Sequence, residues 1–211
     1  MQAFTTHRGI VVPFNRRNID TDAILPKQYL KMLEKTGFGD FLFDDERYLD
    51  PGDVEVAVSE RRPAPTFILN QSPYDRASIL LAQANFGCGS SREHAVWSLV
   101  NFGVRVVIAP SFGEIFYNNS INNALLPIIL DQHIVDELFS YCQVAPEPVL
   151  IVDLQKQLIM SPDQQWPFLI EEGHRQALLN GLDEIGLTLN MADTIKKFEE
   201  RRRSAEPWLF V

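Results

Sequence analysis

The chain is poor in the residues that bind metals or form disulfides. Its 211 residues include two cysteines, Cys88 and Cys142, and four histidines. Two thiols exclude a disulfide framework and a Cys-x-x-Cys metal site, and they are too few to hold a [4Fe–4S] cluster. The histidines show no His-Glu-x-x-His or similar ligand spacing. The sequence therefore predicts no metal site and no cofactor bound by this chain's own residues.

Long apolar runs and an excess of basic charge are also missing. No apolar run approaches the ~20 residues of a membrane-spanning helix, and residues 1–8 contain no apolar signal-peptide segment. With 19 Lys and Arg against 28 Asp and Glu, the net charge is −9, whereas nucleic-acid binding needs a concentrated basic surface. We therefore expect a cytoplasmic protein with no membrane and no nucleic acid as partner.

The residues that are present make an ordinary globular composition, 45% hydrophobic and 22% charged. Continuous apolar runs at residues 79–84, 104–109 and 125–130 alternate with helical segments at about 91–101 and 132–141. Buried strands that alternate with helices are typical of a parallel or mixed sheet covered by helices. The sequence therefore predicts an α/β fold in one domain.

Other segments are less regular. Residues 54–58 and 66–69 are apolar and are predicted to be short strands, and residues 149–160 favour a hairpin. From residue 16 to residue 52 the chain has no clear periodicity, which in a compact domain is more often functional than passive. The acidic residues 44–46 within this stretch are expected to face water.

The C-terminal part has a different character. Two helices are predicted, at about residues 168–180 and 191–203, and the second ends in a basic run that complements the helix dipole. We interpret this run as a solvated helix end rather than a binding patch. The predicted organisation is a single domain of residues 1–211, with a core of about 1–165 and a helical extension of about 166–211.

The segment NFGCGSSREH, residues 85–94, carries the strongest chemical signal. Gly87 and Gly89 follow an apolar strand, and glycines allow positive φ angles and the close approach of a ligand. Ser90 and Glu93 have the spacing of a capping box, which predicts the start of a helix. The free N–H groups of such a helical turn favour an anion.

Arg92 adds to this prediction. A cation in a first helical turn opposes the helix dipole unless an anion lies between them, and a guanidinium matches a carboxylate bidentately. The segment therefore predicts a carboxylate or phosphate site. It lacks the third glycine of a dinucleotide fingerprint and the second glycine of a nucleophile elbow. A serine that only caps a helix is the alternative interpretation of Ser90.

Four segments together resemble a known family. GCGSSREHA at residues 87–95 resembles the active-site serine loop of the aconitase superfamily. Three further segments resemble the small subunits of bacterial 3-isopropylmalate dehydratases: NIDTDAILPKQYLK at 18–31, SFGEIFYNN through LLP at 111–127, and LLNGLDEIGLTL at 178–189. They extend over nearly the whole chain in the family's order. One position departs from the family, because Ala124 stands where it usually has a glycine.

The resemblance implies a swivelling β/β/α three-layer domain of aconitase type, with a C-terminal helical extension, that closes over a large partner subunit. The large subunit holds a [4Fe–4S] cluster through its own cysteines. The complex is implied to be a hydro-lyase that interconverts 2-isopropylmalate and 3-isopropylmalate, both small dicarboxylates, in leucine biosynthesis. Two alternatives stay open: the same chemistry on citraconate/methylmalate or homoaconitate, and a non-catalytic carboxylate-binding module.

The resemblance also implies roles for single residues. Ser90 corresponds to the serine whose alkoxide takes a proton from carbon. Ser91 and Arg92 correspond to residues that hold a substrate carboxylate, and Asp22 to an active-site aspartate. The family's substrate-selecting loop falls on Tyr29, Leu30, Lys31 and Met32.

The chemistry of the residues is compatible with these roles. A serine hydroxyl is a poor base in water, so an alkoxide at Ser90 requires concentrated positive potential, such as that of Arg92 and a helix N-terminus. Cys88, between two glycines, is interpreted as a small residue that fills a tight turn. His94 is interpreted as a packed histidine rather than a catalytic one.

Overall fold

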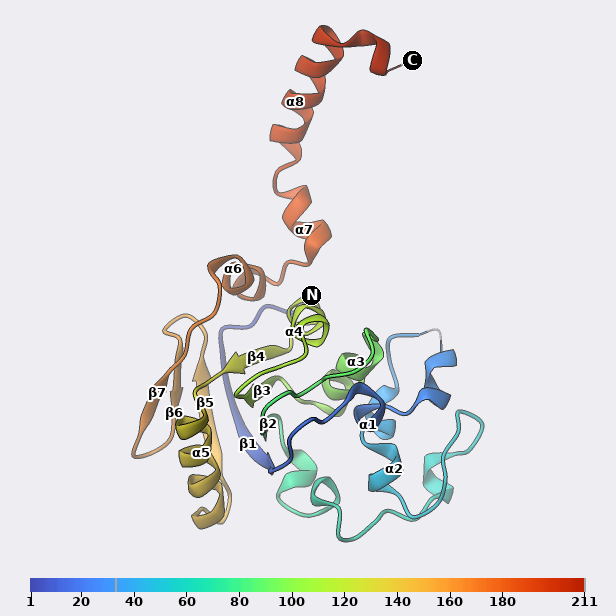
Figure 1. Ribbon diagram of the computed structural model, residues 1–211, viewed down its shortest axis with the longest axis vertical. Coiled ribbons are helices and arrows are strands. Elements are labelled where there is room, and N and C mark those ends of the chain that lie inside the picture. The colour runs from blue at the N-terminus through green and yellow to red at the C-terminus, as the bar shows by residue number, and fades with distance from the viewer. Residues whose placement is uncertain (33, 211) are drawn as a thin grey trace.

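The computed structural model describes residues 1–32 and 34–210, which form a mixed sheet flanked by helices (Figure 1). The sheet has seven strands in the order β4-β3-β2-β1-β5-β6-β7. The strands are β1 (Thr6–Phe14), β2 (Ile79–Ala82), β3 (Val106–Ala109), β4 (Leu126–Ile129), β5 (Val149–Asp153), β6 (Leu158–Met160) and β7 (Gln165–Pro167). The helices are α1 (Thr21–Ile24), α2 (Asp44–Arg47), α3 (His94–Phe102), α4 (Glu114–Asn122), α5 (Gln132–Val144), α6 (Glu172–Asn180), α7 (Glu184–Leu189) and α8 (Ala192–Ala205).

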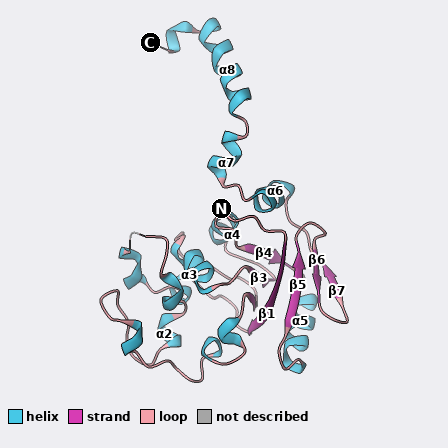
Figure 2. Cartoon of the chain, turned by 180° about the vertical axis from the view of Figure 1, so that it is seen from behind, coloured by secondary structure: helices cyan, strands magenta, loops and turns pink. Residues whose placement is uncertain are grey.

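Strand β1 divides the sheet into a parallel half, β1 to β4, and an antiparallel half, β5 to β7 (Figure 2). It pairs in parallel with β2, with Val11 opposite Ile79, and antiparallel with β5, with Thr6 opposite Asp153. Every residue of β2 and β3 is buried, as expected for parallel strands covered on both faces. The predicted α/β class and the predicted hairpin at residues 149–160 are therefore confirmed.

Alternate residues of the parallel strands point into two different cores, because successive side chains of a strand lie on opposite faces. One core joins Ile79 and Ile108 to helix α5 and the antiparallel half. The other core joins Leu80 and Val107 to Leu99 of α3 and to the loops that precede it. The parallel half is therefore the middle layer of the molecule.

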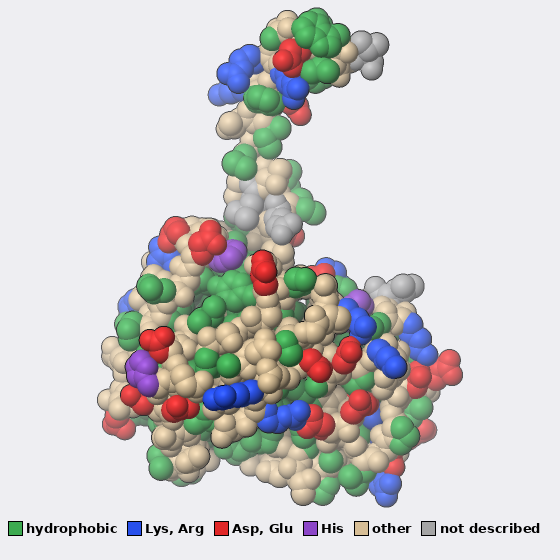
Figure 3. Space-filling model, viewed as in Figure 1, with side chains coloured by type: hydrophobic (Ala, Val, Ile, Leu, Met, Phe, Trp, Pro, Cys, Tyr) green, Lys and Arg blue, Asp and Glu red, His purple; other side chains and the backbone are tan. Residues whose placement is uncertain are grey.

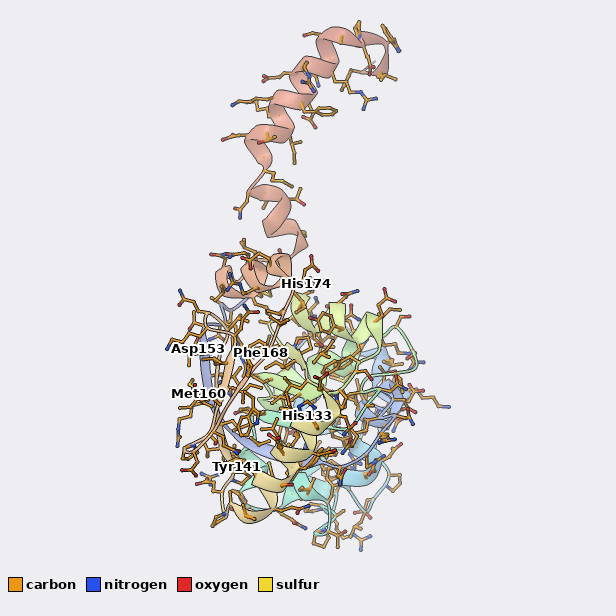
Figure 4. The ribbon with its side chains drawn as sticks, turned by 60° about the vertical axis from the view of Figure 1, so that its left-hand side comes forward. His133, Tyr141, Asp153, Met160, Phe168 and His174 are labelled. Carbon is orange, nitrogen blue, oxygen red and sulfur yellow. The ribbon has the colours of Figure 1, made fainter. Side chains whose placement is uncertain are left out.

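Helix α5 is fixed to the antiparallel half. The hydroxyl of Tyr141 donates to the carbonyl of Val149 at 2.9 Å, and Nε1 of Trp166 donates to Glu137 at 2.9 Å. Phe168, directly after β7, is buried in the same core as α5 (Figure 4). These contacts hold the antiparallel half and α5 together as one layer.

The prediction of strands at residues 54–58 and 66–69 is wrong. These segments contain turns and the 3-10 helices Val58–Glu60 and Ile68–Asn70. Strands β1, β2 and β3 are each paired on both sides, so the middle of the sheet has no edge for a further strand. The apolar residues are used in loop packing instead, with Leu69 buried in the core beside α3.

The C-terminal helices leave the body of the molecule. Helix α6 packs through Leu178, which is fully buried, whereas no residue of α8 is buried and α7 and α8 project as an arm (Figure 1). Figure 3 shows exposed apolar side chains on this arm, which include Ile195 and Phe198. The helix predicted at 168–180 begins later, at Glu172, and α7 lies outside both predicted helices. Among the described helices, none is long and apolar enough to cross a membrane.

Candidate active site

Three loops meet at the carboxyl ends of β1, β2 and β3. The amide of Gly87 donates to the carbonyl of Ile19 at 2.7 Å, and the amide of Thr21 donates to the carbonyl of Cys88 at 2.9 Å. The amide of Phe86 donates to the carbonyl of Ser111 in the third loop at 3.0 Å. In sheets with parallel strands, ligands bind at the carboxyl ends of the strands. The loop contacts therefore place the predicted site residues at the edge where a ligand is expected.

The glycine turn has the backbone conformation that the sequence predicts. Gly87 has a φ of +70° and Gly89 a φ of +95°, and an L side chain in this region costs about 1–2 kcal/mol. A Cβ atom at Gly87 would also overlap the ring of Phe116. The turn therefore needs glycine for its conformation and for its packing, and it brings Ser90 back toward the loop that follows β1.

The predicted capping box of Ser90 and Glu93 is wrong. Helix α3 begins at His94, and no side chain caps it. Instead, Ser90 Oγ lies 2.9 Å from Thr21 Oγ1, and Glu93 accepts a hydrogen bond from Asn123 Nδ2 at 2.7 Å. Both side chains have tertiary partners that replace the local pairing. The Ser90 hydroxyl is therefore not used as a helix cap.

Arg92 and Asp22 lie together, as the assignment of both to one site requires. Arg92 Nη1 donates to Asp22 Oδ1 at 2.7 Å, and the two side chains are 36% and 59% exposed. Arg92 precedes α3 rather than lying in its first turn, because the helix starts later than predicted. An exposed ion pair stabilises a protein by only about 0–1 kcal/mol, so separating the two side chains costs little. Ser91, between Ser90 and Arg92, is exposed.

Thr21 is a residue of this site that the sequence did not reveal. It is 3% exposed, and its Oγ1 accepts a hydrogen bond from the Ser90 amide at 3.1 Å. It lies at the start of α1, which Asp20 caps by accepting from the Ala23 amide at 2.7 Å. The only signal for Thr21 is its position inside the segment at residues 18–31.

The four residues of the predicted substrate-selecting loop lie in different environments. Tyr29 is fully buried and its ring stacks on Phe41, with 4.1 Å between ring centroids. Burial and a hydrogen bond with Asp44 raise the pKa of the Tyr29 hydroxyl. Tyr29 thus packs inside the protein and stabilises the loop rather than facing solvent. Of the other three residues, Lys31 is exposed and Leu30 and Met32 are half-buried.

This loop packs against the helix that follows the glycine turn. Leu30 and Met32 belong to a small apolar cluster with Trp97 of α3, and Phe38 lies edge-on to the ring of His94 at 5.6 Å. Burial lowers the pKa of His94, in keeping with a packed, neutral ring. The loop is therefore close to the site through α3, and its role in selecting a substrate stays a prediction.

The described residues do not fit an iron–sulfur cluster. Cys88 lies in the glycine turn and Cys142 lies in α5, and burial raises the pKa of both thiols, that of Cys142 to about 12. A [4Fe–4S] cluster takes three or four thiolates at one site, and these two thiols lie on different segments of the fold. In the part of the chain that the structure describes, no three or more His, Cys, Asp or Glu residues gather as a metal site.

Two family models match the chain. The model of the aconitase C-terminal domain matches residues 1–133, and the model of the C-terminal domain of the 3-isopropylmalate dehydratase small subunit matches residues 184–211. The first match contains the glycine turn, Ser90, Arg92 and Asp22. The second match covers α7, α8 and the end of the chain.

Individual relatives match over the full length. The chain is 53% identical over 211 residues to the 3-isopropylmalate dehydratase small subunit of Marinobacter nauticus, covering 100% of this chain and 98% of the relative. It is 52% identical over 210 residues to that of Albidiferax ferrireducens, covering 99% and 97%. A crystal structure of 3-isopropylmalate dehydratase from Methanocaldococcus jannaschii has a TM-score of 0.61 at 25% identity, covering 91% of this chain and 99% of that one.

Proposed function

Because the chain belongs to the family of 3-isopropylmalate dehydratase small subunits, we propose that it is the small subunit of a hydro-lyase that interconverts 2-isopropylmalate and 3-isopropylmalate in leucine biosynthesis. The observation that carries the proposal is the position of the Ser90 hydroxyl. This hydroxyl does not cap a helix, and it lies at the same sheet edge as the Arg92–Asp22 pair. The proposed setting is the cytoplasm. The proposed organisation is one swivelling domain with a core of about residues 1–165 and an extension of about 166–211.

The partner in this proposal is a large subunit that brings the [4Fe–4S] cluster on its own cysteines. Two observations support this division. The relatives are named small subunits, and Cys88 and Cys142 of this chain lie apart on different elements. The exposure of Arg92 and Asp22 also suits a half-site that is completed by a second protein.

Arg92 binds a substrate carboxylate in the proposed mechanism. The incoming carboxylate replaces Asp22 on the guanidinium, which offers two parallel N–H donors to a planar anion. Removal of a proton from the carbon beside the carboxylate spreads negative charge onto its oxygens. Arg92 therefore binds the transition state more strongly than the ground state, which is what accelerates the step.

Ser90 moves the proton. Its alkoxide takes the proton from carbon, the electron pair of the C–H bond forms the alkene, and hydroxide leaves from the neighbouring carbon, where the partner's cluster would supply the Lewis acidity that this departure needs. In the return step hydroxide adds to the carbon that lost its proton, and the Ser90 hydroxyl gives its proton to the other carbon, which yields the isomer and restores the alkoxide. Positive charge at Arg92 lowers the free energy of the alkoxide relative to the hydroxyl. Ser91, exposed beside it, is the second proposed carboxylate ligand.

The test is isomerisation of isopropylmalate by the chain mixed with a cluster-loaded large subunit. The chain alone should be inactive. Ser90→Ala should lower kcat at least about 10²–10³-fold, the typical loss when one preorganised polar group is removed. Ser140→Ala is the matched control, because Ser140 is exposed on α5 and bonds only to its own helix at Asp136. Full activity of Ser90→Ala would refute the assignment of Ser90 as the base.

The proposed substrate is tested separately. The names of the relatives favour isopropylmalate over citraconate/methylmalate or homoaconitate, and a panel of the three substrates with the same complex compares them directly. Calorimetry of the lone chain with isopropylmalate tests the alternative of a non-catalytic carboxylate-binding module. Tight binding without a partner would favour that module.

A further inference from the structure

The three contacts of the Thr21 hydroxyl all involve one residue, Ser90. Thr21 Oγ1 accepts from the Ser90 amide at 3.1 Å, lies 2.9 Å from Ser90 Oγ, and is 3.3 Å from the Ser90 carbonyl oxygen, to which it can donate. A hydroxyl has one proton and two lone pairs. Thr21 therefore donates either to the carbonyl or to Ser90 Oγ, and never to both at once.

We propose that Thr21 is the positioning residue of Ser90 and that its single proton turns from the Ser90 carbonyl to Ser90 Oγ when Ser90 is an alkoxide. This inference rests on the proposed role of Ser90 as the base. With neutral Ser90, the Ser90 hydroxyl donates to Thr21, and Thr21 donates to the carbonyl. With ionised Ser90, Thr21 rotates about its Cβ–Oγ bond and donates to the alkoxide. No covalent bond to hydrogen breaks in Thr21.

The energetic consequence follows from the charge. Hydrogen bonds to an ionised acceptor are roughly twice as strong as neutral ones, so the Thr21 contact strengthens when Ser90 loses its proton. A hydrogen bond that favours the charged form makes that form easier to reach. The Ser90 amide stays on a Thr21 lone pair in both states and keeps the two residues in place.

The surroundings hold the Thr21 hydroxyl in this position. Its amide is bonded to the Cys88 carbonyl at 2.9 Å, and Asp20 caps the helix that Thr21 begins. A Cβ atom at Gly89 would lie 3.5 Å from Thr21 Oγ1, so the turn closes over the hydroxyl. The β-branched side chain of threonine also restricts χ1. The oxygen of Thr21 is therefore held in place before the reaction begins, and only its hydrogen has to turn when Ser90 ionises.

The test compares Thr21→Val, which keeps the shape and removes the hydroxyl, with Thr21→Ser, which keeps the hydroxyl. Both are made in the full chain and measured with the large subunit. We expect Thr21→Val to lower kcat about 10- to 100-fold, the range for one hydrogen bond to a charged group, with KM unchanged because Thr21 is 3% exposed and its hydroxyl contacts Ser90. The acid limb of the pH–kcat profile should move up by about one pH unit or more, since a tenfold loss is about one unit. Thr21→Ser should return both values to near those of the wild type.

The outcomes separate this inference from the proposed function. A loss of kcat in Thr21→Val with an unmoved pH profile and no rescue by Thr21→Ser would mean a purely structural role and would overturn the inference. Full activity of Thr21→Val beside an inactive Ser90→Ala would overturn it as well, while leaving Ser90 as the base. An active Ser90→Ala would refute the proposed base itself. If Thr21→Val does not fold, Thr21→Ala takes its place with the same expectations.

Discussion

Two of the arginine–aspartate pairs in the loops around the parallel strands differ in exposure and in geometry. Arg61 and Asp44 are 2% and 0% exposed and form two parallel hydrogen bonds of 2.6 and 2.8 Å. Arg92 and Asp22 are 36% and 59% exposed and share a single hydrogen bond of 2.7 Å. The same two residue types therefore make one closed pair and one open pair.

The closed pair organises its loop. Arg61 also donates to the carbonyl of Asp50 at 3.0 Å and lies over the ring of Tyr48, 4.1 Å from its centroid. It is 3.4 Å from the hydroxyl of Tyr29 as well. A charge taken out of water is costly unless its donors are satisfied, and these contacts satisfy the guanidinium from several directions. Its partners cannot be exchanged without opening the loop.

The open pair has the opposite property. Water surrounds most of Asp22, so replacing it by another carboxylate costs little. Burial, rather than residue type, separates the structural ion pair from the pair that is proposed to bind a substrate carboxylate. Two changes test this difference, and a third extends it to another exposed pair; they follow in order of expected effect.

Asp44→Asn should destabilise the folded chain by about 3–5 kcal/mol, because it leaves the Arg61 charge buried without a counter-charge. Urea unfolding of the isolated chain measures the change. Asp45→Asn is the matched control on the next residue, which is exposed, and it should change the free energy of unfolding by less than about 0.5 kcal/mol. Equal effects of the two changes would show that the buried pair is not a structural element.

Arg92→Lys should lower the activity of the complex about 10²-fold, since lysine cannot bind a carboxylate bidentately. The free energy of unfolding should stay within about 0.5 kcal/mol of the wild type, because the pair that it breaks is exposed. Arg62→Lys, in the exposed pair with Asp50, should leave activity unchanged. A large loss of stability in Arg92→Lys, with activity retained, would make the open pair a structural one.

The smallest effect concerns acid titration of a third pair, Arg62 and Asp50. Hydrogen bonds from Arg62 lower the pKa of Asp50 to about 2. A carboxyl with a lowered pKa in the folded state contributes stability that is present above the unfolded pKa of 3.8 and is lost as the pH falls toward 2. Arg62→Gln should raise the pKa of Asp50 toward 3.8, measured by NMR of the carboxyl carbon. A pKa that stays near 2 in this variant would rule out the Arg62 side chain as the cause.

The acidic residues 44–46 show which part of this comparison could be predicted from the sequence. The expectation that they face water is wrong for Asp44, which is fully buried against Arg61. It holds for Asp45 and Glu46, which are exposed. A run of acidic residues does not show which of them pairs with an arginine 17 positions further along the chain.

The parts of the fold that the sequence predicts well are those with local signals. Continuous apolar runs predict β2, β3 and β4, and the alternation with helices predicts the α/β class. The segments at 54–58 and 66–69 have a similar apolar character, but they pack in loops, with Leu69 buried in the core beside α3. Whether an apolar segment pairs as a strand depends on its neighbours in space, and composition does not record them.

The candidate site also has features that the local sequence predicts and contacts that it does not. Conformation at Gly87 and Gly89 follows from residue type, and the family resemblance points to Ser90, Arg92 and Asp22 without knowledge of any contact. The contact between Ser90 and Thr21 joins residues 69 positions apart, so no local pattern contains it. The capping box failed because that distant partner replaced the local one.

One consequence concerns strand β1. Its first residues, Thr6 to Ile10, pair with β5, and its last residues, Val11 to Phe14, pair with β2. The loop with Thr21 and Asp22 continues from β1, and the turn with Ser90 continues from β2. Any partial unfolding that detaches β1 would thus break the sheet in two and pull the serine away from its threonine at the same moment. In this chain, loss of the sheet at β1 and loss of the Ser90–Thr21 contact that the proposed reaction uses would therefore occur together.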